Sequence, residues 1–169
     1  MKRSLILLAF IASCFTIYAE KLTSKYVSRL VSDGMLYFIG PFELPNQQKG
    51  QPVEMDITYI TKSDSLTFNM SIYTSVIIQT DSIKFVSNTP KTITDFTLFF
   101  IDKKGKNFIH RYSCKLPYSY FEELYTEANP FVVEVYTDKG QVLQYAYNAK
   151  KWSKECSWMQ QIIQIIKSN

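Results

Sequence analysis

His110 is the only histidine of the chain, and it is the first residue whose type could support catalysis. It alternates with Phe108, Tyr112 and Cys114 in a predicted strand, so these four side chains share one face. A histidine that acts as a general base needs a nucleophile beside it, and the sequence has neither a nucleophile-elbow motif nor a second histidine. We therefore interpret His110 as a half-buried, hydrogen-bonded packing residue, and we predict no catalytic residue, no cofactor and no metal site.

Paired carboxylates are the second group that could carry out chemistry, because glycoside hydrolysis needs two carboxyl groups that flank the scissile bond. Glu54 and Asp56 share one face of a predicted strand, and Glu122 and Glu123 open a predicted helix. The first pair lies opposite the apolar face, which favours a solvated surface. Glu122 is expected to form a capping box with Ser119, while Glu123 suits the positive end of the helix. A small secreted hydrolase is therefore the alternative function.

Aromatic residues are the one enriched class, at 15% of the chain. A tyrosine offers an apolar face and a polar edge, so it suits stacking on sugars and protein interfaces. We predict a surface that binds a protein or a glycan, formed by tyrosines of one helix and the hairpin after it: Tyr118, Tyr120, Tyr125, Tyr136 and Tyr145. The competing interpretation is that these rings fill the core of a sheet, because aromatic residues favour strands.

The N-terminus has the features of an export signal over residues 1–19. Lys2 and Arg3 supply a short positive region, and an apolar stretch follows that is too short for a membrane span. Cleavage after Ala19 is one processing route. The residues before Cys14 also resemble a lipobox, in which Cys14 would become lipidated and supply the only expected membrane contact. The protein is therefore predicted to be periplasmic, on the cell surface or secreted.

Export also bears on the two remaining cysteines, Cys114 and Cys156. Two cysteines in an exported chain commonly form a disulfide, so this pair is predicted to be bonded. The alternative is two separate buried thiols.

The net charge of +4 falls to about +2 once Lys2 and Arg3 are removed, which is too weak to indicate nucleic-acid binding.

The elements that must position these residues follow from periodicity and turn residues. Alternating apolar residues predict hairpins over 53–59 with 66–72, 96–101 with 107–114, and 131–137 with 141–147. A further strand over 35–44 is expected to be interrupted at Gly40-Pro41. Helices are predicted over 21–33, from the Pro117 region to about residue 127, and over 153–167.

Short connections and the lack of βαβ crossovers predict an α+β fold. Its mainly antiparallel sheet would be meander-like or sandwich-like, with an N-terminal helix, a short middle helix and a C-terminal helix, and residues 20–169 would form one globular domain. The favoured function is a non-catalytic binding or structural module of the cell envelope with an unknown protein or glycan ligand. A flat exposed apolar patch would support binding, and acidic pocket residues with raised pKa values would support the hydrolase.

Overall fold

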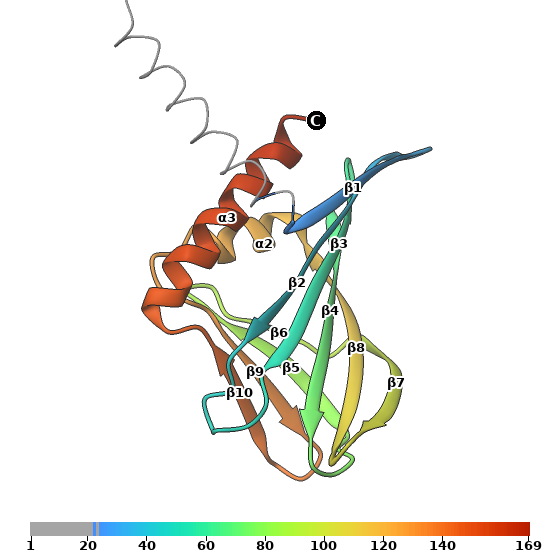
Figure 1. Cartoon of the computed structure of the whole chain (residues 1–169), viewed down its shortest axis with the longest axis vertical. Coiled ribbons are helices and arrows are strands. Elements are labelled where there is room, and N and C mark those ends of the chain that lie inside the picture. Colours follow the sequence, from blue (N-terminus) through green and yellow to red (C-terminus); the bar gives the residue numbers. More distant parts are fainter. Residues whose placement is uncertain (1–21, 23) are drawn as a thin grey trace, which may run out of the picture.

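The computed structural model describes residues 22 and 24–169, and Figure 1 shows two antiparallel β-sheets with helices at one end. The predicted export signal over residues 1–19, with Cys14, lies outside the described residues. The six-stranded sheet has the strand order β1 (Tyr26–Val31), β2 (Gly34–Leu44), β3 (Val53–Ile60), β4 (Ser65–Thr74), β8 (Asn107–Pro117) and β7 (Phe96–Lys104). The four-stranded sheet has the order β10 (Val142–Ala146), β9 (Val132–Thr137), β5 (Thr80–Val86) and β6 (Lys91–Ile93). The helices are α2 (Tyr118–Leu124) and α3 (Ala149–Lys167).

The mainly antiparallel α+β fold is confirmed, and so are the three predicted hairpins. In β3 the side chains alternate strictly between buried and half-buried, as a period of two requires. The interruption of β2 is also confirmed, since the pairing of β2 with β3 shifts between Ile39 and Phe42, around a cis Gly40-Pro41 bond. Proline has no backbone N–H to give to the sheet, so the register breaks there.

The two sheets share one core. The ring of Phe68 on β4 lies 5.3 Å from the ring of Phe85 on β5, edge to face. The hydroxyl of Thr80, also on β5, donates a hydrogen bond of 2.9 Å to the Tyr112 hydroxyl on β8. The apolar faces of both sheets are thereby removed from water, which is the main favourable contribution to folding.

The predicted N-terminal helix over 21–33 is wrong. Tyr26–Val31 forms strand β1, which pairs antiparallel with β2 from Tyr26 opposite Ile39 to Val31 opposite Gly34. Gly34 has a φ of +139°, a conformation that favours glycine, and it therefore ends a tight turn into β2 rather than a helix. The β-branched Val27 and Val31 fit a strand, and pairing with β2 overrides the weak helical pattern.

Helix α3 covers one end of the sheets (Figure 1), and its Trp158 ring lies 6.2 Å from the Phe42 ring of β2. It begins at Ala149, four residues before the predicted start, because the side chain of Asn148 accepts a hydrogen bond from the Lys151 backbone N–H.

The capping box predicted for α2 is wrong. Pro117 is the N-cap residue and no side chain caps this helix, since β8 continues directly into it.

The predicted disulfide between Cys114 and Cys156 is not formed in the structure, where both residues are free buried thiols. The thiol of Cys114 on β8 points to the Phe68 carbonyl at 3.7 Å, within the six-stranded sheet. The thiol of Cys156 on α3 donates to the Tyr125 carbonyl at 3.0 Å. Each thiol is thus held by a different part of the core, which matches the alternative of two separate thiols.

Candidate functional site

His110 is a packing residue, as its sequence context predicts, but the structure buries it more completely than the expected half-buried position. Its side chain is fully buried, and its Nε2 lies 2.9 Å from the Thr74 hydroxyl. Its ring stacks nearly parallel to that of Tyr112, at a centroid distance of 6.3 Å. Burial lowers the pKa of His110 from its ordinary value of 6.5, which keeps the imidazole neutral near pH 7. His110 is therefore a packing residue and is not placed to meet a substrate.

The five predicted binding tyrosines do not form one surface. Tyr120, Tyr125 and Tyr145 are buried, and Tyr125 packs 5.6 Å from the Trp152 ring of α3. Tyr118 is half-buried and stacks on the ring of Tyr59. Only Tyr136 is both half-exposed and outside the aromatic core, and its hydroxyl donates to Glu134 at 2.7 Å. The binding-surface prediction fails for the three buried rings, because the two sheets and α3 enclose them.

Neither predicted carboxylate pair is free to work as a pair. On the outer face of the six-stranded sheet, Asp56 forms an ion pair with Arg111 and accepts a hydrogen bond of 2.8 Å from Asn69. Glu122 of α2 forms an ion pair of 2.8 Å with Lys167 of α3, and half-buried Glu123 lies beside it on the helix. Both Asp56 and Glu122 thus have structural partners.

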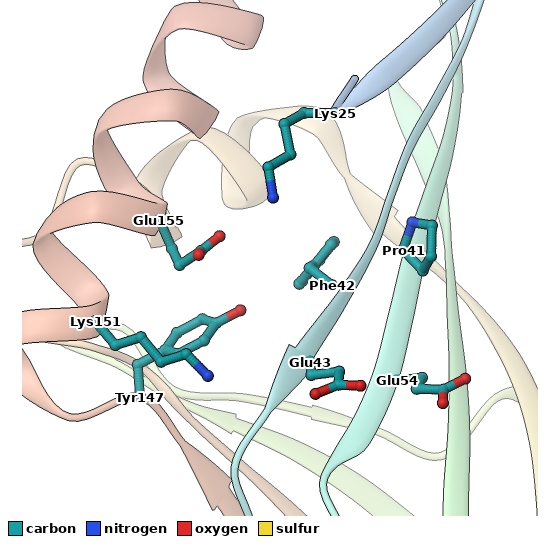
Figure 2. A pocket seen from close by; sticks show the side chains of 8 residues that line it. All are labelled: Lys25, Pro41, Phe42, Glu43, Glu54, Tyr147, Lys151 and Glu155. Atoms are coloured by element: carbon teal, nitrogen blue, oxygen red, sulfur yellow. The ribbon is translucent and has the colours of Figure 1, made fainter. Parts of the chain in front are cut away.

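A cleft of about 380 Å³ lies between α3 and the strands β2 and β3, and we call it the α3 cleft. Figure 2 shows the side chains that line it. Its lining combines three acidic residues, two lysines, one proline and two aromatic residues: Glu43, Glu54, Glu155, Lys25, Lys151, Pro41, Phe42 and Tyr147. The volume is within the range of ligand sites, about 300–1,000 Å³. Sequence reasoning identified Glu54 but missed the other lining residues, because they come from four separate segments.

Charges of the α3 cleft lie on two sides (Figure 2). Glu43 and Glu54 face each other directly on the paired strands β2 and β3. Lys151 lies in the first turn of α3, with its ammonium 5.9 Å from the centroid of the Tyr147 ring. Glu155, also on α3, accepts a hydrogen bond from the Trp158 indole N–H. The cleft therefore has carboxylates on the sheet side and both an ammonium group and a carboxylate on the helix side.

The second candidate surface is strand β7, at one edge of the six-stranded sheet. Four consecutive large apolar side chains, Leu98 to Ile101, are between 38% and 60% exposed. A bulge at Phe99 places Leu98 opposite Tyr112 and Phe100 opposite Arg111, so apolar groups emerge on both faces of the strand. The sequence signal for this surface was the unbroken apolar run in a strand that was expected to alternate.

No family model matches this sequence, and no curated protein and no solved structure shows significant similarity to it. None of the described helices is both long enough and apolar enough to cross a membrane. Within residues 22 and 24–169, no three His, Cys, Asp or Glu side chains gather closely enough to hold a metal ion. The functional argument therefore depends on the chemistry of β7.

Proposed function

We propose that this protein is an exported, non-catalytic binding module of the cell envelope that docks another protein along strand β7. The observation that carries the proposal is the run of exposed apolar side chains from Leu98 to Ile101 on an edge strand. Soluble proteins rarely leave contiguous apolar surface in water, and where they do it commonly marks an interaction site. An edge strand also presents backbone N–H and C=O groups that a further strand can pair with.

The apolar surface continues beyond β7. Val76 and Ile77, in the connection from β4 to β5, are 57% and 55% exposed. The backbone of Val76 bonds to His110, and His110 lies opposite Ile101 of β7 in the sheet. These contacts bring the connection to the C-terminal half of β7, so a docked strand would meet apolar side chains from two segments.

Charge indicates the chemistry of the partner segment. Lys103, Lys104 and Lys106 are exposed at the C-terminal end of β7 and the turn after it. A partner strand would therefore carry apolar residues along its length and acidic residues at the end beside these lysines, because opposite charges steer association and fix register. We assign the docking position to an extended segment of another protein with this pattern.

Two peptides test this proposal. One alternates valine and threonine between flanking aspartates, and the other has lysines in place of the aspartates. The aspartate peptide should shift the backbone amide NMR signals of β7 and leave those of the opposite edge strand β1 in place, while the lysine peptide should bind more weakly. The variant Phe100→Ser should reduce the shifts, with Leu30→Ser on β1 as the matched control.

The proposal would be overturned if the aspartate peptide shifted β1 as strongly as β7, or if the two peptides bound equally well. A concentration-dependent dimer that Phe100→Ser abolishes would also overturn it, because a second copy of the chain would then occupy the edge. Export is tested separately by the intact mass of the mature protein, which should begin at Glu20 or at lipidated Cys14. Detection of Met1 on the mature protein would contradict export by either route.

A further inference from the structure

We propose that residues 45–48, in the connection from β2 to β3, are a strap that closes the β10 edge of the four-stranded sheet against pairing with another chain. This connection runs past β10 (Figure 1), and its Asn46 forms an isolated antiparallel bridge with Tyr145 of β10. The inference goes beyond the docking function of β7 and does not depend on it, because β10 and β7 are edge strands of different sheets.

The first observation is that the strap takes up backbone groups of β10 that face away from β9. The backbone N–H of Gln47 donates to the Gln144 carbonyl at 2.8 Å. The backbone N–H of Ala146 donates in turn to the Pro45 carbonyl at 3.0 Å. Alternate residues of an antiparallel ladder direct their N–H and C=O groups to the same side, so these are the groups that a further strand would need.

The second observation is that two glutamine side chains complete this cover. The side-chain amide of Gln47 donates to the Ala146 carbonyl at 2.8 Å. The side-chain amide of Gln48 donates to the Val142 carbonyl at 3.0 Å. With the carbonyl of Gln144, three alternate carbonyls of β10 are therefore occupied. An incoming strand would have to break these hydrogen bonds before it could pair with β10.

The third observation is that the strap does not become a new edge strand itself. The backbone N–H of Gln48 donates to the Asn46 side chain at 2.7 Å, so it is not offered to a neighbouring chain. Lys49 has a φ of +61°, which takes the backbone out of the strand conformation. Gly50 suits the next position, because a Cβ there would lie 2.5 Å from the Asn46 amide nitrogen. The strap thus satisfies β10 and then turns away.

The other edge of the same sheet is protected in a different way. Strand β6 has only three residues, and a very short edge strand offers little to a partner. Both edges of the four-stranded sheet described here are therefore protected, whereas β7 of the six-stranded sheet has nine residues and exposed apolar side chains. The strap limits strand addition to the six-stranded sheet, and this selection is its function.

Removal of the hydrogen-bond donors tests the strap. Gln47→Pro with Gln48→Ala removes one backbone and two side-chain donors to β10, and Gln47→Ala with Gln48→Ala removes the side-chain donors alone. Gln51→Ala is the matched control, because it truncates another exposed glutamine of the same connection. In NMR hydrogen exchange, the Ala146 N–H should exchange at least about fivefold faster in the proline variant, less so in the double alanine variant, and at the wild-type rate in the control.

An opened strap should also let β10 pair with a second chain. Sedimentation velocity should detect a concentration-dependent dimer of the proline variant that neither the wild-type protein nor Gln51→Ala forms under the same conditions. This dimer should persist when Phe100→Ser is added, because it forms through β10 and not through β7. The test is therefore decided whether or not β7 docks a partner.

Three results would overturn the inference. The Ala146 N–H could exchange at the wild-type rate in both variants, which would show that these donors do not hold the strap. Exchange could become faster without any association at protein concentrations up to about 1 mM, which would show that the strap guards nothing. The dimer could disappear with Phe100→Ser or form equally with Gln51→Ala, which would place the contact outside β10. If the proline variant does not fold, the double alanine variant decides both measurements.

Discussion

The free energy of unfolding should fall as the pH is lowered from about 6.5, because the folded state keeps His110 neutral. The groups against its ring are the Thr74 hydroxyl, the Tyr112 ring and the backbone of Val76, and none of them carries a charge. Burial therefore determines the direction of the shift, and the pKa of His110 in the folded protein lies below 6.5. The unfolded chain exposes the imidazole, which then titrates near its ordinary value.

The sign follows from proton uptake. Below pH 6.5 the unfolded state binds a proton that the folded state does not, so acid favours unfolding. The slope approaches about 1.4 kcal/mol per pH unit for one proton, and between pH 6.5 and 5 the loss is at most about 2 kcal/mol. This is a sizeable part of the roughly 5–15 kcal/mol that stabilises a typical domain. Glu134, whose pKa is lowered by its hydrogen bond from Tyr136, loses its contribution only below its ordinary value of 4.5.

Urea denaturation at pH 7.5, 6.5, 5.5 and 5.0 measures the effect, with His110→Gln as the comparison. The chain has one histidine, so the variant should lose most of the slope in this window. A free energy of unfolding that stays level or rises as the wild-type protein goes from pH 7.5 to 5.0 would refute the reasoning. If the variant does not fold, the ring NMR signals of wild-type His110 decide instead, since the midpoint of their titration should lie below pH 6.5.

Three further predictions concern the core and the α3 cleft. Burial raises the pKa of the Cys114 thiol to about 12, and Cys156 is also buried. Both thiols should therefore resist iodoacetamide in the native protein and react after denaturation without reductant, which mass spectrometry would show. A requirement for reductant would indicate a disulfide. Tyr125→Ala should cost about 3–5 kcal/mol in urea denaturation and Tyr136→Ala much less, and equal losses would contradict the burial pattern. Glu54→Gln should raise the stability of the protein by a few tenths of a kcal/mol, more at low salt, because it removes the repulsion with Glu43 and the amide oxygen can still accept the hydrogen bond from Tyr73. A loss of stability would show that the hydrogen bond between Tyr73 and the Glu54 carboxylate outweighs this repulsion.

Local patterns were enough to predict most of the strands. The alternation from Val53 onward and the turn at Gly140, which has a φ of +73°, depend only on neighbours in the chain. Those signals predicted all three hairpins and the broken strand at Gly40-Pro41 correctly. The same level of reasoning failed for β1, because Tyr26–Val31 also has a helical spacing of apolar residues and only pairing with β2 decides between the two conformations.

The sites depended on tertiary structure for a physical reason. Alternation shows which side chains share a face, but it does not show what lies across from that face. Tyr145 on β10 and Cys156 on α3 are buried because the second sheet and α3 pack against the rest of the core, and Glu43 meets Glu54 because of the register between β2 and β3. Sequence alone thus determined the antiparallel α+β class and the packing role of His110. Packing and register, which join residues far apart in the chain, decided how deeply His110 is buried, which groups line the α3 cleft and which apolar strand faces water.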